Sequence, residues 1–136
     1  MKIFVCTDKN GGMLFNNRRQ SRDRVVIDDI MKQIDSQNLY IHSYSKPLFP
    51  DCENIVISDV PMDEAQDTDY CFVENLALAP YQDKISEVII YNWNREYPSD
   101  FSLDIILEPG EWKLEEESEF RGSSHEKITR KVYKKQ

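Results

Sequence analysis

The sequence predicts an α/β fold, with a mixed, mainly parallel sheet, few helices and an antiparallel pair of strands at the C-terminal end. Short apolar, β-branched runs recur along the chain, and one amphipathic helix follows the first of them. Two longer strand-like segments surround a Gly-Ser-Ser loop in the last third. We expect residues 1–136 to form a single domain, because this length suffices for one sizeable core.

The first strand and the only clear helix come early. Residues 2–7 form a compact apolar run, which indicates a buried strand, and residues 8–20 follow as a predicted loop. Ser21 is the expected N-cap of a helix that begins at Arg22. Its apolar positions keep helical spacing, so one face is buried: Val26, Ile27, Ile30, Met31 and Ile34.

The middle of the chain alternates strands with short connections. Residues 38–43 predict a second strand, and the order strand, helix, strand implies a right-handed crossover and a parallel pair. Further strands are expected at residues 54–58, 69–74 and 87–91, the last of these being the central one. Proline-bounded turns separate them, including a single helical turn from Pro61.

The last third changes character. Residues 101–107 predict a strand, followed by a turn. Residues 112–120 and 128–133 then predict two strands joined by a loop, which gives an antiparallel pair and makes the sheet mixed.

Charge and cysteine usage limit the function classes. A net charge of −8 argues against a protein that mainly coats nucleic acid or an anionic membrane, and it fits a soluble enzyme or a binder of basic partners. The three cysteines are widely spaced and lack a C-x-x-C pair, which indicates a reducing compartment. The sequence shows no signal-peptide pattern and no run near the roughly 20 apolar residues that span a bilayer, so we expect a cytoplasmic protein.

The end of the central strand is the first candidate site. Polar and aromatic residues follow its apolar run at once, namely Asn92, Trp93, Asn94 and Arg95. In open α/β sheets, ligands bind beyond the carboxyl ends of the strands. The alternative is a strand terminus whose aromatic side chains cap the core.

An anion site is the second candidate. Polar and basic residues precede the helix, where backbone N–H groups and the helix dipole favour negative charge: Asn16, Asn17, Arg18, Arg19 and Arg22. We expect the loop 11–21 and the strand end 92–95 to line one polar, positive cleft that binds an anionic ligand. The alternative is a solvated loop whose arginines pair with the acidic segments.

Asp23 and His125 are the candidates for catalysis. Asp23 stands in the first turn of the predicted helix, where a carboxylate favours the helix dipole and pairs with a nearby arginine. His125 stands in a Gly-Ser-Ser loop, where it could act with Glu126 and Lys127. Two histidines together with a lysine can cleave RNA by acid–base chemistry.

Several segments, taken in order, resemble dihydrofolate reductase. Residues 7–13 are similar to the first-strand exit and mobile loop of those enzymes. Asp23 falls near their active-site carboxylate, and the resemblance therefore implies that it acts as an acid or base in a concave site. Pro47-Leu-Phe, residues 54–58 and residues 112–133 are similar to their proline-leucine turn, third strand and closing hairpin. The resemblance implies a fold like a trimmed dihydrofolate reductase.

The chain departs from those enzymes at the cofactor. They follow the central strand with adjacent glycines that let the backbone approach the dinucleotide, and here Tyr91, Asn92 and Trp93 stand in that place. We therefore expect no intact NADPH site, no active reductase and no other cofactor.

The chain is also similar, over nearly its whole length, to short bacterial proteins that carry the name ribonuclease Z. The similar segments are residues 12–21, 69–74, 91–98 and 122–129. That name implies an RNA-processing hydrolase, an endoribonuclease. True ribonuclease Z holds two zinc ions in a histidine-rich cluster, whereas this chain has only His42 and His125, so we expect no metal.

Two hypotheses of different class remain. In the first, the chain is a soluble, dihydrofolate reductase-like module that binds an anionic small molecule or a protein partner of basic character. In the second, it is an RNA-processing hydrolase, supported by the arginine cluster, His125 and the basic tail at residues 127–135. Acidic net charge and the missing glycines favour the first.

Overall fold

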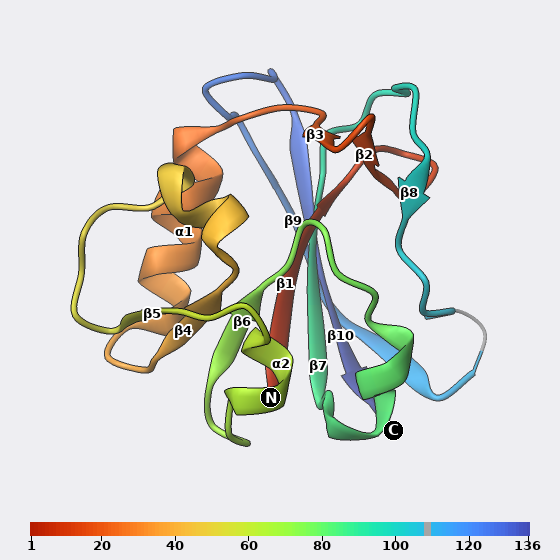
Figure 1. Cartoon of the computed structure of the whole chain (residues 1–136). Coiled ribbons are helices and arrows are strands. Elements are labelled where there is room, and N and C mark those ends of the chain that lie inside the picture. The colour runs from red at the N-terminus through yellow and green to blue at the C-terminus, as the bar shows by residue number, and fades with distance from the viewer. Residues whose placement is uncertain (108–109) are drawn as a thin grey trace.

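A seven-stranded mixed sheet forms the centre of the molecule, with strand order β5-β4-β6-β1-β7-β10-β9 (Figure 1). The computed structural model describes residues 1–107 and 110–136. The five strands from β5 to β7 are parallel, and β10 joins β7 and β9 in antiparallel pairs. The mixed, mainly parallel α/β fold predicted from the sequence is confirmed.

The parallel part of the sheet is built from strands joined by crossover connections, but the two strands around α1 do not form the expected pair, because β6 lies between β1 and β4. Its elements are β1 (Lys2–Thr7), α1 (Arg24–Ile34), β4 (Leu39–Ile41), the 3₁₀ helix η1 (Ser43–Leu48), β5 (Ile55–Ile57), α2 (Pro61–Glu64), β6 (Tyr70–Phe72), the 3₁₀ helix η2 (Ala79–Lys84) and β7 (Glu87–Asn92). β1 lies between β6 and β7. The carboxyl ends of these three strands therefore open at one edge of the sheet.

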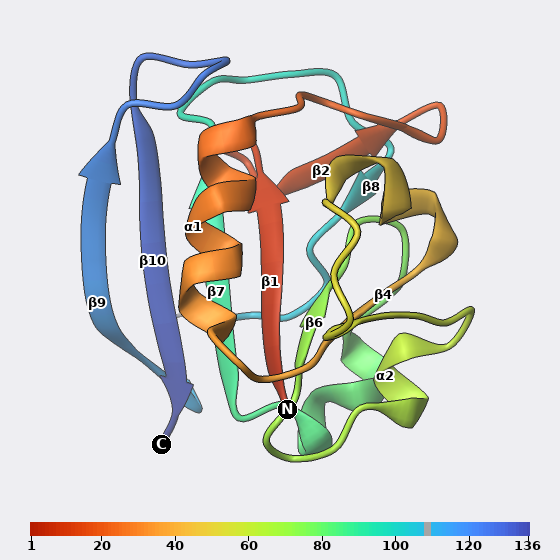
Figure 2. The ribbon, with the colours of Figure 1, turned by 90° about the vertical axis from the view of Figure 1, so that its left-hand side faces the viewer.

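The closing hairpin is confirmed as an antiparallel pair. It consists of β9 (Trp112–Phe120) and β10 (Ile128–Lys135), and β10 runs two residues beyond the predicted end of its strand. A register shift between Val132 and Tyr133 marks a bulge in the pair. The β9–β10 loop reaches over the N-terminal end of α1, at the top of the view in Figure 2.

A second, three-stranded sheet corrects the prediction of a loop at residues 8–20. It is made of β3 (Arg18–Arg19), β2 (Gly12–Phe15) and β8 (Phe101–Ser102). Asn16 and Asn17 form the turn between β2 and β3 with φ of 50° and 61°, values that asparagine tolerates better than most residues. The strand expected at residues 101–107 is reduced to its first two residues, because only they pair with β2.

The N-cap of α1 is Asp23, which corrects the assignment to Ser21. The Asp23 backbone is extended, and its Oδ1 accepts hydrogen bonds from Val25 N (2.9 Å) and Val26 N (3.1 Å). An aspartate is as good a cap as a serine, so the helix begins two residues later than predicted.

Strand alternation divides the core between the two faces of the sheet. Phe4, Phe72 and Tyr91 pack against α1 on one face. On the other face, Ile3 and Val5 pack with side chains of α2, of the η2 segment and of the small sheet. No helix in residues 1–107 or 110–136 is long and apolar enough to cross a membrane.

Candidate functional site

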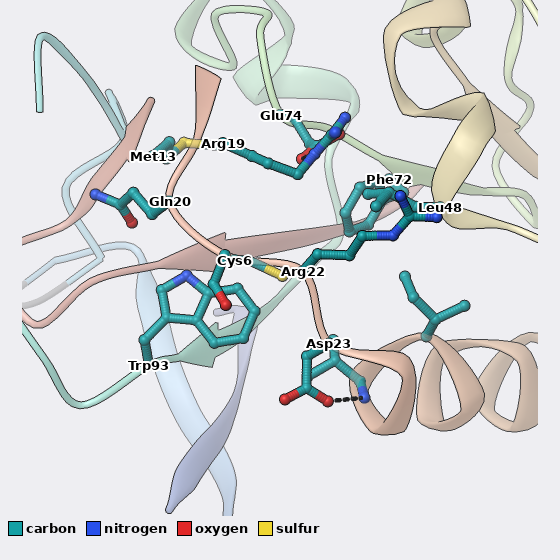
Figure 3. Close-up of a pocket in the computed structure, with 13 residues that line it drawn as sticks. Cys6, Met13, Arg19, Gln20, Arg22, Asp23, Leu48, Phe72, Glu74 and Trp93 are labelled. Carbon is teal, nitrogen blue, oxygen red and sulfur yellow. Dashed lines mark hydrogen bonds and ion pairs between the residues drawn. The ribbon is translucent and has the colours of Figure 1, made fainter. Parts of the chain in front are cut away.

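A narrow groove lies beyond the carboxyl ends of β1, β6 and β7, under the start of α1 (Figure 3). Apolar side chains make most of its wall, and the lining residues are Cys6, Met13, Arg19, Gln20, Ser21, Arg22, Asp23, Val26, Ile27, Leu48, Phe72, Glu74 and Trp93. Its free volume is about 20 Å³, which is room for one water molecule. The side chains from both sides of the groove already fill it.

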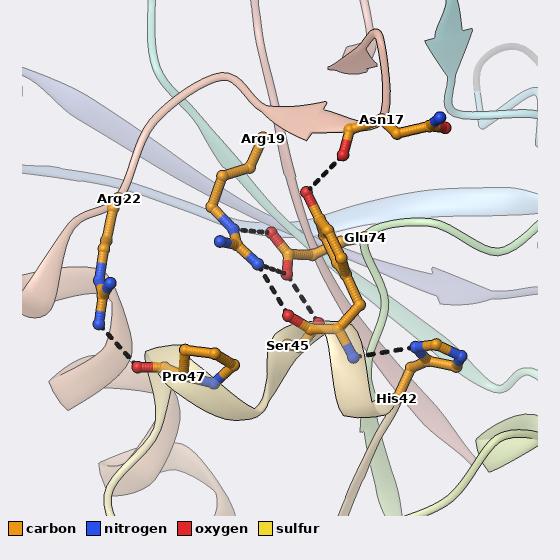
Figure 4. A network of polar contacts seen from close by, with 8 residues as sticks. Asn17, Arg19, Arg22, His42, Ser45, Pro47 and Glu74 are labelled. Carbon is orange, nitrogen blue, oxygen red and sulfur yellow. Dashed lines mark hydrogen bonds and ion pairs between the residues drawn. The ribbon is translucent and has the colours of Figure 1, made fainter.

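The charges in this groove are used within the protein (Figure 4). The Arg19 guanidinium donates to both carboxylate oxygens of Glu74, at 2.9 and 3.0 Å, and to the backbone oxygen of Tyr44. Ser45 Oγ, which is buried, donates to the same carboxylate at 2.7 Å, and Arg22 donates to the Pro47 oxygen. The hydrogen bond between Arg19 and Glu74 is the main cause that raises the pKa of Arg19.

The positive cleft expected at residues 11–21 is therefore not present in that form. The groove contains Arg19 and Arg22 but also Asp23 and Glu74, so the four formal charges cancel. The strand end contributes only Trp93 to this groove, while Asn94 and Arg95 line a different cavity. The charge of Arg19 is not available to a ligand, because the carboxylate of Glu74, which follows β6, forms an ion pair with it.

Asp23 is fully engaged as an acceptor. Besides capping α1, its Oδ2 accepts from Ser124 N (2.8 Å) and Ser124 Oγ (2.6 Å). Burial alone would raise its pKa, but the hydrogen bonds from Ser124, Ser123 and Val26 outweigh burial and lower the pKa of Asp23 to about 2. The side chain is ionised at neutral pH and is a weak base, which suits a structural anchor better than an acid–base catalyst.

Gly122 makes this anchor possible. A Cβ atom at residue 122 would overlap the Asp23 carboxylate and the side chain of Ile128. The absence of a side chain lets the β9–β10 loop approach the N-terminal end of α1 closely enough for Ser124 to bind Asp23.

An open cavity of about 480 Å³ lies on the other side of Trp93. It is lined by Trp93, Asn94, Arg95, Ser124, His125, Glu126 and Lys127. The segment after β7 supplies the first three residues, and the β9–β10 loop supplies the rest. The volume is sufficient for a small ligand. Four residues named as candidates from the sequence thus line one cavity: Trp93, Asn94, Arg95 and His125.

Arg95 carries a positive charge in the lining of this cavity. It is exposed, and across the described residues its guanidinium makes no ion pair or side-chain hydrogen bond. Lys127 pairs with Glu119 at 3.2 Å, but both side chains are more than half exposed, so the pair is weak. Glu126 is the single carboxylate in the lining.

His125 is fixed by contacts on three sides. Its ring stacks on Trp93 with centroids 5.0 Å apart, Nδ1 lies 2.7 Å from Ser124 Oγ, and Nε2 lies 2.6 Å from the Tyr97 hydroxyl. Burial and the neighbouring Arg95 lower its pKa, while Asp23 opposes them. The ring is therefore neutral at pH 7.

The tautomer of His125 follows from Asp23. The ionised carboxylate can only accept, so it takes the single hydroxyl proton of Ser124. Ser124 Oγ must then accept from His125 Nδ1–H, and His125 Nε2 accepts from the Tyr97 hydroxyl. The result is a chain Tyr97–His125–Ser124–Asp23 in which every donor points toward the carboxylate.

The remaining candidates have structural roles or point to solvent. Asn16 and Asn17 form the β2–β3 turn, and Arg18 is exposed without lining either cavity. Asn92 Oδ1 accepts from Asn94 N at 2.8 Å. Asn94, with φ of 58°, donates to the Lys127 oxygen (3.1 Å) and to Thr129 Oγ1 (2.9 Å), which ties the segment after β7 to β10.

Sequence reasoning missed Asp8, the residue that organises the loops around the groove. Asp8 is buried, and its carboxylate accepts from Asn10 N, Gly12 N, Gln20 Nε2 and Tyr97 N. Gln20 Oε1, in the groove lining, has no hydrogen-bond partner in the part of the chain that the structure describes, and its orientation is fixed because its amide nitrogen donates to Asp8. An aspartate three residues before a Gly-Gly pair is a turn signal that pointed to Asp8.

No family model and no curated protein sequence matches this chain. Among residues 1–107 and 110–136, no group of three or more His, Cys, Asp and Glu side chains is arranged to hold a metal ion.

Proposed function

We propose that this protein is a binding module for an anionic small molecule, held in the cavity lined by Arg95, His125 and Lys127. The observation that carries the proposal is the guanidinium of Arg95, which has no partner in residues 1–107 and 110–136 and lies at a cavity of about 480 Å³. A phosphate or carboxylate group would give Arg95 the paired hydrogen bonds that it lacks. Lys127 adds a second positive charge, and a local excess of positive charge attracts an anion despite the net charge of −8.

His125 adjusts the same site to its ligand. The ring is neutral, with its pKa lowered by burial and by Arg95. An anion beside Arg95 would offset the repulsion from the guanidinium and raise the pKa of His125, so binding takes up protons near neutral pH. The affinity for an anion therefore rises as the pH falls toward 6.

The wider proposal is a dihydrofolate reductase-like protein without an intact NADPH site. Its support is Trp93, which is buried, stacks on His125 and follows the central strand where those enzymes have adjacent glycines. A dinucleotide placed there would have to displace the indole. We expect NADPH not to stabilise the protein.

The second candidate, an RNA-processing hydrolase, would use the same cavity with His125 as proton carrier. The Tyr97–His125–Ser124–Asp23 chain is the observation in its favour. In the serine hydrolase triad the histidine lies between the serine and the aspartate, whereas here the serine is in the middle and its proton is directed to a weak base. That order favours binding over catalysis.

A thermal-shift screen tests the proposal. The probes are inorganic phosphate, nucleotides, pterins and NADPH, and a ligand at about 100 times its Kd adds about 2.7 kcal/mol to the stability of the native state. We expect a phosphate-bearing probe to raise the melting temperature of the wild type and to lose this effect in Arg95→Gln. Arg18→Gln is the matched control, since Arg18 is exposed and lines neither cavity.

Three outcomes contradict the proposal: equal shifts in the two variants, a shift with NADPH alone, or cleavage of RNA that depends on His125. The first removes the cavity as the binding site. The second restores a dinucleotide site, and the third establishes the hydrolase.

A further inference from the structure

A second groove lies on the face of the sheet opposite α1, between α2 and η2. It has a volume of about 250 Å³ and is lined by Asp59, Val60, Pro61, Met62, Leu76, Ala77, Pro80 and Tyr81. We call it the proline–tyrosine groove. Seven of its eight lining residues are apolar or aromatic, and Val60 is 49% exposed at its rim. The groove has the size of one large aliphatic side chain.

The segment that carries this groove is strongly acidic, and two of its carboxylates lie at the groove: Asp59 lines it, and Asp63 accepts from Tyr81. Residues 59–83 contain seven Asp and Glu residues and no Lys or Arg. Three of the seven are engaged inside the protein: Glu64 accepts from Ser58, Asp69 from Gln66 N, and Glu74 from Arg19. The other four are exposed and make no ion pair within the described residues: Asp59, Asp63, Asp67 and Asp83.

Hydrogen bonds hold the acidic rim next to the apolar floor. The Tyr81 hydroxyl donates to Asp63 Oδ2 at 2.8 Å, which fixes a carboxylate beside the aromatic ring. Two basic groups next to this segment each donate to a backbone oxygen: Lys84 Nζ to the Met62 oxygen (3.0 Å) and the Met1 amino group to the Lys84 oxygen (2.9 Å). An apolar slot framed by fixed negative charge is complementary to a cationic chain that carries one apolar side chain.

We propose that the proline–tyrosine groove is a docking site for an extended, Lys- or Arg-rich segment of a partner protein, which inserts one aliphatic side chain into the groove. Burial of that side chain supplies most of the affinity, and the rim carboxylates select for basic flanking residues. The tyrosine in the wall suits an extended segment, since aromatic side chains line the grooves that bind extended, proline-rich peptides. This site is independent of the Arg95 cavity, because the two have no lining residue in common.

Fluorescence anisotropy with a labelled peptide tests the proposal. The probe is fluorescein-Lys-Lys-Pro-Leu-Pro-Lys-Lys-amide, and its controls replace leucine by serine or every lysine by glutamate. We expect saturable binding of the probe. The serine peptide should bind about tenfold less tightly, because it lacks the apolar side chain that would be buried in the groove. The glutamate peptide should not bind, because its charges are repelled by the carboxylates at the groove. Raised salt should weaken binding of the probe.

Protein variants locate the binding. Val60→Ser and the double variant Asp59→Asn, Asp63→Asn should each bind the probe about tenfold less tightly. This corresponds to a loss of about 1.4 kcal/mol in the free energy of binding. Val60, Asp59 and Asp63 are exposed, so both variants should keep the wild-type circular dichroism spectrum. The matched controls are Ile106→Ser, at an isoleucine that is 79% exposed, and Asp28→Asn on α1.

Any of three results overturns the proposal. The wild type fails to bind the probe saturably, the control variants weaken binding as much as the groove variants, or sedimentation shows a dimer that Val60→Ser dissociates. The last result would assign the groove to a second copy of the chain.

Discussion

The groove under α1 and the cavity beside it share one wall, Trp93, but they use their charged side chains differently. In the groove, Arg19 is paired with Glu74 and Asp23 is saturated by donors from α1 and Ser124. In the cavity, Arg95 has no partner among the described residues and Lys127 has only an exposed one. Residues of the same kind thus stabilise the fold on one side of Trp93 and remain available to a ligand on the other.

Enclosure and available space are two different criteria for a binding site, and the two regions differ in both. The groove is the more enclosed and more apolar of the two, yet it has room for only about one water molecule. The cavity is more open but has about 480 Å³ and an unpaired cation. Where charges are already satisfied and space is filled, enclosure indicates packing rather than binding.

The largest expected effect comes from breaking the charge pair of the groove. Glu74→Ala leaves Arg19 and Ser45 without their acceptor in a mostly buried place, so the free energy of unfolding should fall by about 3 kcal/mol. Urea unfolding measures it. Glu53→Ala is the control, because Glu53 is exposed and should cost less than about 0.5 kcal/mol. Equal losses in the two variants would mean that the pair adds nothing to stability.

The second effect concerns Asp23. Asp23→Ala removes the N-cap of α1 and the two bonds from Ser124, and we expect a loss of about 2 kcal/mol. Asp28→Ala, at an exposed position on the same helix, should stay near the wild type.

The pKa of Asp23 adds a pH signature to this variant. Its folded pKa of about 2 lies below the ordinary value of 3.8, so its contribution to stability is complete above pH 4 and is lost as the pH falls toward 2. The difference in stability between the wild type and Asp23→Asn should therefore shrink over this window. A difference that stays constant from pH 5 to pH 2 would contradict the assigned role.

The smallest change in stability is expected in the cavity, at Arg95. Arg95→Gln should alter the free energy of unfolding by less than about 0.5 kcal/mol, because an exposed, unpaired guanidinium supports no other group. The pKa of His125 should rise, since Arg95 is one of the causes that lower it, whereas Asp23→Asn should lower the pKa further. NMR titration of the His125 ring measures both, with Arg18→Gln as the control.

The effect of His125 on the pH dependence of stability can be measured with the same variants. A histidine whose folded pKa is lowered favours folding above its unfolded pKa, near 6.5, and this contribution is lost as the pH falls below that value. In Arg95→Gln the loss of stability between pH 7 and pH 5 should be smaller than in the wild type. A larger loss would show that Arg95 does not act on His125.

Local patterns were enough to predict most of the fold from the sequence. Apolar, β-branched runs predicted β1, β4, β5, β6 and β7, and helical spacing predicted the buried face of α1, because both depend on side chains a few residues apart. The small sheet was missed, since β2 is joined to β8 by pairing across about ninety residues of sequence. Likewise, Ser21 and Asp23 are both good N-cap residues. Ser124, about a hundred residues away, donates to the Asp23 carboxylate and so favours Asp23 as the cap.

For the site, the sequence predicted that Trp93, Asn94 and Arg95 stand at the carboxyl end of the central strand, and these three line the cavity. His125 was a separate candidate, and the fold brings it to them in place of the loop 11–21. Only the tertiary structure decided which charges are paired. Glu74 pairs with Arg19, whereas the guanidinium of Arg95 has no partner among the residues that the structure describes, and no local rule distinguishes these two arginines. The physical reason is that an ion pair depends on a few ångströms of separation between residues far apart in the chain, whereas burial and helical spacing are written into neighbouring residues.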